Sequence, residues 1–428
     1  MKARFQNGIA AMMARGLPHV MVANIAQQGV AFIGVLLIAK LLPPDEFALV
    51  RIALAYAAIG TVLAAGGITA PVLRYCADIT MSLSERRALL AVGIRRVLVI
   101  SAGVSVGALG LLLAWPMDKL QAGVFASYVL QLPGLALASL LLVYLQANQQ
   151  FKALAFYQVA IRVVTLVLTV GAVYWFGLAG LLVAAFVTAY LICVPLLTLS
   201  RPLFRPATAV AVPADFSSLA FYSVFGTAVT ALGQYADVIM LDFVGTQKEM
   251  IAVYSLATVF FFAAVALGGA VQSVATPMFT ALIHDPALFK KRLVRWSTLL
   301  SVAAVPVAVG LVLLAKAIET WFLGDSYAGL SNILAILMLK FFLWSTFAVG
   351  GAALVGVGAI KQGAWIAVFA TILTVTIGLP LCERYGIYGA AWTQVLVTVV
   401  SAVLIWWVLV VETRALHSQA SRASGENG

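Results

Sequence analysis

The sequence predicts an all-α protein that crosses a membrane many times. Of its 428 residues, 64% are hydrophobic and only 10% are charged, whereas an ordinary soluble domain is about 25% charged. A membrane-spanning helix needs about 20 mostly apolar residues, and long apolar runs such as Met21–Leu42 and Val97–Trp115 recur along the chain. Barrel strands would instead be about ten residues of alternating polarity. A water-soluble globule is therefore excluded.

Twelve helical spans are predicted, in two sets of six. The first set comprises residues 18–41, 47–75, 89–114, 121–147, 153–175 and 178–199. The second comprises residues 217–243, 250–282, 296–315, 331–357, 363–381 and 387–411. These spans leave no room for a soluble catalytic domain.

The spans predict five regions in chain order. Residues 1–17 spread three cations among apolar residues and are expected to form an amphipathic lead-in on the cytoplasmic membrane surface. Residues 18–200 and 217–411 are expected to form two six-helix bundles. Between them, residues 201–216 contain three prolines and two arginines and are predicted to be a cytoplasmic linker. Residues 412–428 are expected to be a disordered cytoplasmic tail.

The basic residues predict the orientation of the spans. With a cytoplasmic N-terminus, eighteen of the 26 lysines and arginines lie on the cytoplasmic side and six on the other. This asymmetry indicates that both termini are cytoplasmic. The net charge of +11 then reflects topology and attraction to anionic lipid rather than binding to nucleic acid.

The two halves of the chain resemble each other. A shift of 209 residues lays Lys152–Gly180 over Lys361–Gly389 without a gap, and six of 29 positions are identical, including Gly177 with Gly386. Gly66-Gly67 and Gly268-Gly269 also occupy similar places in the second span of each half. Since each half has an even number of spans, the sequence predicts parallel repeats with a substrate path at their interface.

Catalytic and metal-binding motifs are absent from the sequence. No lysine is followed by serine or threonine, as a phosphate-binding P-loop requires. The three cysteines and three histidines are scattered singly, which predicts neither a disulfide framework nor a zinc site. We expect a protein that is not an enzyme and has no cofactor apart from a proton or sodium gradient.

Cations within the spans are the first candidate site residues, because an ionisable group inside a bilayer is costly and usually functional. Arg162 lies midway along the fifth span, and Gln158, Arg162, Thr165 and Thr169 share one helix face, which is typical of a water-lined surface. Lys340 lies in the tenth span and coincides with Gln131 under the 209-residue shift. The alternatives are a structural ion pair for Arg162 and snorkelling towards the interface for Lys340.

Further polar residues complete the candidate set. In the seventh span Gln234 and Asp237 share a face, and Asp237 is a candidate proton or cation site, with a salt bridge to Arg162 or Lys340 as the alternative. Asn24 and Gln28 in the first span are candidates for lining the path or for joining helices. Arg51 in the second span is a candidate for guiding an anionic head group.

Several short segments resemble a known transporter family. They are Leu41-Leu42-Pro43-Pro44-Asp45-Glu46-Phe47, Arg74-Tyr75, Val253-Tyr254-Ser255-Leu256-Ala257 and Gly386-Ile387-Tyr388-Gly389-Ala390-Ala391. Over nearly the whole chain, the sequence resembles bacterial oligosaccharide flippases of the multidrug/oligosaccharidyl-lipid/polysaccharide exporter superfamily. It departs from that pattern at Lys40 and Ala48, where arginine and glycine are expected.

The resemblance implies a fold, a substrate and a cellular setting. The fold would be a V-shaped pair of six-helix bundles in the bacterial inner membrane, working by alternating access. The substrate would be a polyprenyl-pyrophosphate-linked oligosaccharide, moved to the periplasmic leaflet for surface polysaccharide assembly, such as lipopolysaccharide or exopolysaccharide. Membrane lipids, a polysaccharide polymerase and glycosyltransferases would be its partners.

The resemblance also implies roles for the candidate residues. Arg162 and Lys340 would hold the pyrophosphate, Gln131, Gln158 and the threonines would contact sugar hydroxyls, and Asp237 would couple transport to protons. Three alternatives stay open: a multidrug extruder that exchanges cationic drugs for protons or sodium, a lipid II flippase, and a non-transporting scaffold for a polysaccharide synthase.

Overall fold

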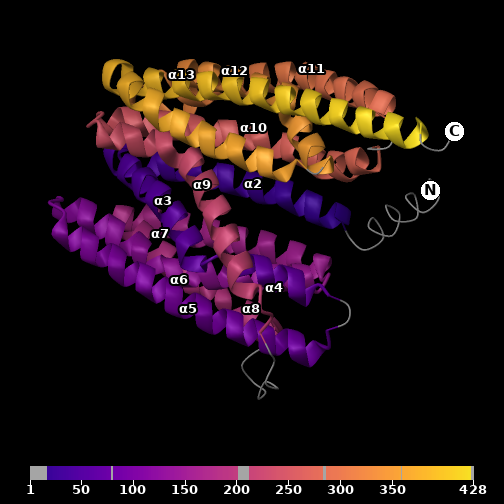
Figure 1. Ribbon diagram of the computed structural model, residues 1–428. Coiled ribbons are helices and arrows are strands. Elements are labelled where there is room, and N and C mark those ends of the chain that lie inside the picture. Colours follow the sequence, from indigo (N-terminus) through magenta and orange to yellow (C-terminus); the bar gives the residue numbers. More distant parts are fainter. Residues whose placement is uncertain (1–16, 79–80, 201–211, 283–285, 358, 426–428) are drawn as a thin grey trace. The chain divides into compact units, whose positions relative to one another are not determined.

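A computed structural model describes residues 17–78, 81–200, 212–282, 286–357 and 359–425 (Figure 1). All regular structure in these ranges is helical. The chain divides into two compact units, and the boundary falls between Ala231 and Leu232.

The N-terminal unit is built around one central helix. Its elements are α2 (Leu17–Leu41), α3 (Pro44–Ala65), α4 (Thr69–Cys76), α5 (Leu83–Ala114), α6 (Lys119–Ala147), α7 (Phe151–Leu191), α8 (Cys193–Ser200) and the first part of α9 (Phe216–Phe243). Helix α6 packs against α3, α4, α5, α7 and α8, while α2 packs against α7. A Cβ on Gly134 would lie 2.6 Å from the carbonyl oxygen of Ala189, so only glycine allows this approach of α6 to the following helices.

The predicted single span 47–75 is wrong, because a pair of glycines divides it into α3 and α4. Gly66 ends α3 with φ 56°, and Gly67 follows with φ 66°. A Cβ on Gly67 would lie 2.0 Å from the carbonyl oxygen of Ala220 in α9. The corresponding pair Gly268-Gly269 stays within the continuous helix α10, so the two pairs differ in structure.

The C-terminal unit is arranged around α12. It contains the rest of α9, α10 (Lys248–Ala281), α11 (Pro286–Ile318), a π-helical turn η1 (Glu319–Leu323), a 3-10 turn η2 (Asp325–Tyr327), α12 (Leu330–Gly356) and α13 (Ile360–Gly425). Helix α12 packs against α10, α11 and α13. At one end of the unit, Phe279, Phe289, Val349 and Leu409 belong to a shared buried core.

Two of the long helices are hairpins. The backbone is non-helical at Gly177 (φ 56°, ψ −140°) in α7 and at Gly386 (φ 54°, ψ −132°) in α13. A Cβ on Gly180 would lie 2.1 Å from the carbonyl oxygen of Ala172, although eight residues span about 12 Å in a straight helix. Likewise, a Cβ on Gly389 would lie 1.9 Å from the carbonyl oxygen of Leu381. The structure therefore repeats this feature at the predicted shift of 209 residues.

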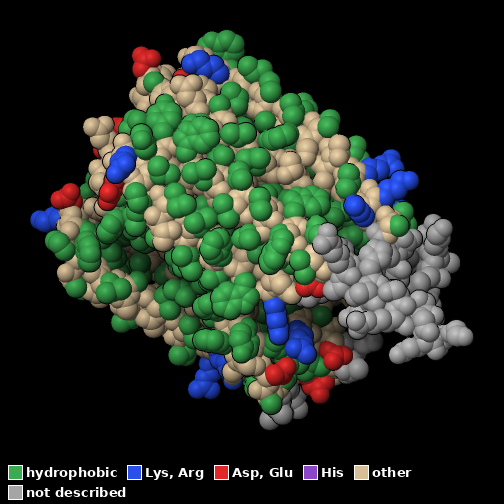
Figure 2. Space-filling model, turned by 45° about the horizontal axis from the view of Figure 1, so that its top comes forward, with side chains coloured by type: hydrophobic (Ala, Val, Ile, Leu, Met, Phe, Trp, Pro, Cys, Tyr) green, Lys and Arg blue, Asp and Glu red, His purple; other side chains and the backbone are tan. Residues whose placement is uncertain are grey.

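The helices form a multi-pass membrane protein. Among the described residues, nine helices are long and apolar enough to cross a bilayer, two of them containing the hairpins, and Ile25–Leu41 is a shorter apolar helix. All twelve predicted spans overlap described helices. Figure 2 shows hydrophobic side chains over most of one face, with charged side chains mainly around its edge.

The structure describes only part of the predicted lead-in, linker and tail. Residues 1–16 and 201–211, which hold most of the predicted lead-in and linker, lie outside the described ranges. The boundary between the compact units lies inside α9, whose first turns pack on α4 and α5. Helix α13 continues to Gly425 where a disordered tail was expected, and between Glu412 and Gly425 no glycine or proline interrupts it.

Candidate functional site

A buried carboxylate on α9 is the centre of a polar network in the C-terminal unit. Asp237 is only 5% exposed. The hydroxyl of Tyr254, on α10, donates to Oδ2 of Asp237 at 2.6 Å, and the amide N–H of Val238 donates to Oδ1 at 2.8 Å. Tyr254 is itself fully buried.

A glutamine joins this carboxylate to a lysine. Gln394, on α13, donates from Nε2 to Oδ2 of Asp237 at 3.3 Å, while its Oε1 accepts a hydrogen bond from Nζ of Lys340, on α12, at 2.7 Å. The ammonium of Lys340 also lies 4.3 Å from the ring centroid of Phe261, a typical cation–π distance. We call Asp237, Tyr254, Lys340 and Gln394 the α9–α13 network.

The network balances charge inside a membrane-spanning unit. A buried charge is costly unless it is paired and hydrogen-bonded, and here one anion and one cation are linked through a single amide. Lys340 therefore does not snorkel to the interface. Asp237 and Lys340 are both described residues and make no direct salt bridge to each other. Instead, Gln394 hydrogen-bonds to both residues within the C-terminal unit.

Two members of the network were missed from the sequence. Tyr254 lies in the segment Val253–Ala257, which was used only as a sign of family resemblance. Gln394 is a polar residue in the apolar last span, so the reasoning that singled out Asn24 and Gln28 also applied to it. Neither residue could be assigned to Asp237 without knowing how the helices pack.

The predicted stripe of the fifth span lies on α7, in the N-terminal unit. Gln158 accepts a hydrogen bond from Gln27 of α2 at 3.4 Å, and both side chains are half-buried. Arg162, one turn further along, is exposed. Among the described residues the ion pairs are Arg74 with Asp215 and Lys316 with Glu319, and Arg162 takes part in neither.

The stripe is not uniformly accessible. Thr165 is half-buried, and its carbonyl oxygen accepts a hydrogen bond from the buried hydroxyl of Thr169 at 2.6 Å. On α2, Gln28 is exposed, whereas the side chain of Asn24 lies outside the described set. Of the predicted polar residues on these two helices, Arg162 and Gln28 are therefore exposed, while Gln158 is joined to Gln27.

The other predicted residues are not brought to one place. Gln131 is only 4% exposed and donates to the carbonyl oxygen of Ser127 in its own helix, so it offers no surface to a substrate. Arg51 is half-buried in the second turn of α3. Gln234 is exposed on α9, one turn before Asp237.

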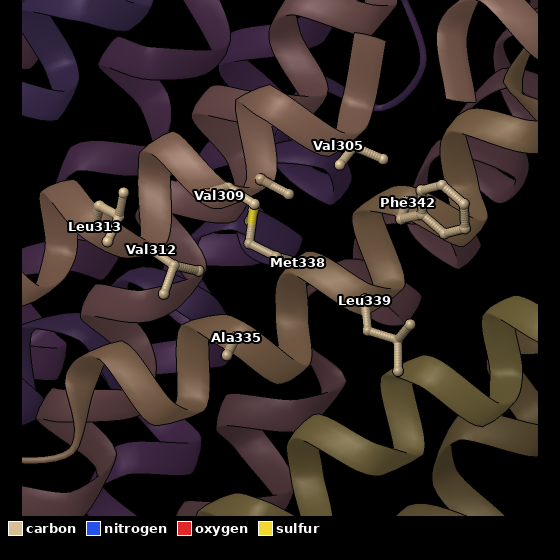
Figure 3. Close-up of a pocket in the computed structure, with 9 residues that line it drawn as sticks. Val305, Val309, Val312, Leu313, Ala335, Met338, Leu339 and Phe342 are labelled. Carbon is tan, nitrogen blue, oxygen red and sulfur yellow. The ribbon is translucent and has the colours of Figure 1, made fainter. Parts of the chain in front are cut away.

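An apolar groove lies between α11 and α12. It has a volume of about 380 Å³, and its walls include Val305, Val309 and Leu313 of α11 with Met338 and Phe342 of α12 (Figure 3). Lys340 lies about 140° round α12 from Ala335 in the groove wall. The groove and the α9–α13 network therefore use different faces of α12, and the groove suits only hydrocarbon.

Comparison with known proteins supports a transporter fold. The sequence profile of a family described as "Polysaccharide biosynthesis protein" matches residues 37–332. The structure is similar to a lipid II flippase, MurJ, in an inward closed conformation, with a TM-score of 0.74, 13% identity, and coverage of 92% of this chain and 89% of that one. No curated protein matches the sequence.

Multidrug transporters have the same fold. A multidrug resistance MATE family transporter of the MOP superfamily, in an inward-facing conformation, has a TM-score of 0.74, 12% identity, and coverage of 92% of this chain and 96% of that one. A superfamily transporter from Pyrococcus furiosus, described as having a binding pocket of reverse polarity, has a TM-score of 0.62, 12% identity, and coverage of 93% and 95%. At these identities the likeness shows the fold alone.

Proposed function

Because the chain belongs to the polysaccharide biosynthesis protein family, we propose that it is a flippase for a polyprenyl-pyrophosphate-linked oligosaccharide. It would move this lipid from the cytoplasmic to the periplasmic leaflet of a bacterial inner membrane by ion-coupled alternating access. The substrate would serve the assembly of a surface polysaccharide, and the chain would work beside a polymerase and glycosyltransferases.

The observation that carries this proposal is a cation inside membrane-spanning helices of each unit. Arg162 on α7 is exposed, and Lys340 on α12 is held by Gln394 and Phe261. A pyrophosphate carries negative charge, and a guanidinium binds phosphate oxygens through two parallel hydrogen bonds. In a region of low dielectric this attraction is much stronger than in water. An acceptor of cationic drugs would instead favour exposed acidic groups.

Lys340 links substrate binding to the ion that drives transport. In this structure its charge is balanced by Asp237 through Gln394. Protonation of Asp237 would remove the anion that balances the ammonium and so change how Lys340 interacts with a pyrophosphate. The charge state of Asp237 would in this way couple the ion to the substrate. Within the N-terminal unit, Arg162 would bind the pyrophosphate, with Gln158, Thr165 and Gln28 available for sugar hydroxyls.

The donors around Asp237 favour a proton over sodium as the coupling ion. Its carboxylate meets a hydroxyl of Tyr254, an amide N–H of Gln394 and the backbone N–H of Val238. A metal cation of this kind requires oxygen lone pairs, as hard cations do. The N–H groups of Gln394 and Val238 supply none, and the hydroxyl of Tyr254 is used as a donor. A proton needs only the carboxylate itself.

Complementation tests the proposed substrate. A host lacking the gene would be given the wild type, Arg162→Ala, or the control Arg384→Ala, which removes an exposed arginine near a hairpin tip. We expect loss of surface polysaccharide and accumulation of lipid-linked oligosaccharide with Arg162→Ala, at equal amounts of membrane protein. A normal amount of surface polysaccharide with Arg162→Ala would show that Arg162 does not bind the substrate.

Two further arms separate the alternatives. If the host lacking the gene made normal polysaccharide but became sensitive to cationic drugs, the extruder hypothesis would replace this one. In proteoliposomes, transport driven by a pH gradient without sodium would support the proton. Transport that requires sodium at constant pH would contradict it.

A further inference from the structure

The first turns of α11 gather four cations on an outward-facing surface. Lys290, Lys291, Arg292 and Arg295 are all exposed. The first turn of this helix contains no acidic residue. We call these four residues the α11 basic segment. None of them belongs to the α9–α13 network or to the α7 stripe.

Two apolar residues, one before the cations and one between them, anchor the basic segment to the core. Phe289 and Leu293 are 2% and 5% exposed and belong to the buried core shared with α10, α12 and α13. The rings of Phe279 and Phe289 pack edge to face, with centroids 5.1 Å apart. Phe289 and Leu293 are four residues apart and lie on the helix face that packs on the core, so the charged residues of the segment lie off that face. The backbone of the segment is therefore already ordered before a charged ligand binds, which lowers the entropic cost of binding.

Neighbouring elements add another cation and aromatic side chains. Lys361 is exposed at the start of α13, two residues after Ala359 of the same core. Trp296 and Trp406 are partly buried against that core. The acidic Glu412, three residues after Leu409, accepts a hydrogen bond from Gln362 at 2.9 Å. Cations outnumber acids at this end among the described residues, and tryptophans are typical of the membrane interface.

We propose that the α11 basic segment is a binding site for the head groups of anionic phospholipids. Clusters of four or more lysines and arginines next to a membrane-spanning helix attract anionic lipid. Here the helix continues from Arg295 into a span whose outer face carries exposed Leu299, Val302 and Val305. A lipid head group on the cations would place its acyl chains along that face. The cations match a charged head group and the apolar face matches acyl chains, so the expected ligand is a lipid.

Lipid titration tests this site with a matched pair of variants. The purified protein would be titrated in one detergent with phosphatidylglycerol or phosphatidylcholine and followed by native mass spectrometry. K290Q/R295Q removes two cations from the segment, and K119Q/R384Q removes one exposed lysine and one exposed arginine elsewhere. We expect phosphatidylglycerol affinity to fall about fivefold for each segment cation removed, and to stay unchanged in K119Q/R384Q.

The charge-retaining variant K290R/K291R separates loss of the site from damage to the fold. It should bind phosphatidylglycerol as the wild type does, and added salt should weaken binding in both. Equal binding of the two lipids by the wild type would overturn the proposal, as would equal phosphatidylglycerol affinity in K290Q/R295Q. Retention of an acidic protein without any lipid preference would overturn it too. These outcomes do not depend on which substrate is transported.

Discussion

Gly177 and Gly386 reverse the chain in the same way, each at the tip of a helical hairpin. Their backbone angles agree within ten degrees, at φ 56°, ψ −140° and φ 54°, ψ −132°. Each hairpin then closes so tightly that a Cβ three residues later would meet a backbone carbonyl. Residues with side chains rarely adopt this conformation. The repeat is therefore conserved in backbone geometry within one chain, and each tip depends on glycine.

Replacing the tip glycine should destabilise the C-terminal hairpin. Gly386→Ala forces a side chain into a positive-φ conformation, which costs about 1–3 kcal/mol. We expect a lower melting temperature of the purified protein in detergent. Gly363→Ala is the control, since Gly363 lies in the helical part of α13 with no atom within 4 Å of its Cβ position. That variant should melt as the wild type or slightly higher. Equal melting of the two variants would contradict the argument.

A buried glutamate should stabilise the start of α12. Glu319 is 8% exposed, and it accepts hydrogen bonds from the backbone N–H of Ser331 at 2.9 Å and of Gly329 at 3.3 Å. Acceptors at a helix N-terminus are worth about 0.5–2 kcal/mol. Glu319→Ala should lower the melting temperature accordingly. Asp325→Asn, an exposed acid in the same connection, should leave it unchanged, and a similar loss in both would refute the capping role.

The contact of Asp215 with α4 should make stability depend on acid pH. The hydroxyl of Tyr75 donates to Asp215, with Arg74 3.5 Å away on the other oxygen. The hydrogen bond from Tyr75 lowers the pKa of Asp215 below its ordinary value, and the charge of Arg74 lowers it further. A lowered folded pKa stabilises the protein above the ordinary pKa, and this gain is lost as the pH falls through the folded value.

Tyr75→Phe removes the hydroxyl and keeps the ring stacked on Phe216, with centroids 6.5 Å apart. We expect this variant to melt below the wild type at neutral pH and to converge with it as the pH falls through the folded pKa of Asp215, which lies below the ordinary value of about 4. Tyr385→Phe, at an exposed tyrosine, serves as the control at each pH. A difference that stays constant down to acid pH would show that the hydroxyl acts without the carboxylate.

Local patterns predicted most of the fold, while the site depended on packing. Apolar runs identified the helices, and the match of Gly177 with Gly386 indicated the repeat. The positive φ at these two glycines was not predicted. The dipeptide alone does not distinguish Gly66-Gly67, where the helix breaks, from Gly268-Gly269, which stays helical. What makes the first pair break is the approach of α9, which no local pattern contains.

The candidate site shows the same division. Asp237 and Lys340 stand out in the sequence because ionisable residues rarely occur in apolar spans. Their partner Gln394 lies 157 residues from Asp237, so the link appears only once α9, α12 and α13 are packed. Gln131 was chosen by its equivalence to Lys340 under the repeat, and the structure buries it. Two residues at equivalent positions of the repeats can therefore have different surroundings in the structure.

Removing both charges of the α9–α13 network should separate stability from transport. Lys340→Met leaves Asp237 buried without its counter-charge, and breaking a buried pair in this way costs about 3–5 kcal/mol. In Asp237→Asn/Lys340→Met neither charge is left. The oxygen of the new amide can still accept a hydrogen bond from Val238, and its NH2 group can donate to the hydroxyl of Tyr254. We expect the double variant to regain most of the melting temperature lost by Lys340→Met, since replacing both members of a buried pair is often neutral. Polysaccharide export should nevertheless stay absent in the complementation assay, because no titratable carboxylate remains in the network. Export by the double variant at the wild-type level would show that the network is structural and that the coupling acid lies elsewhere.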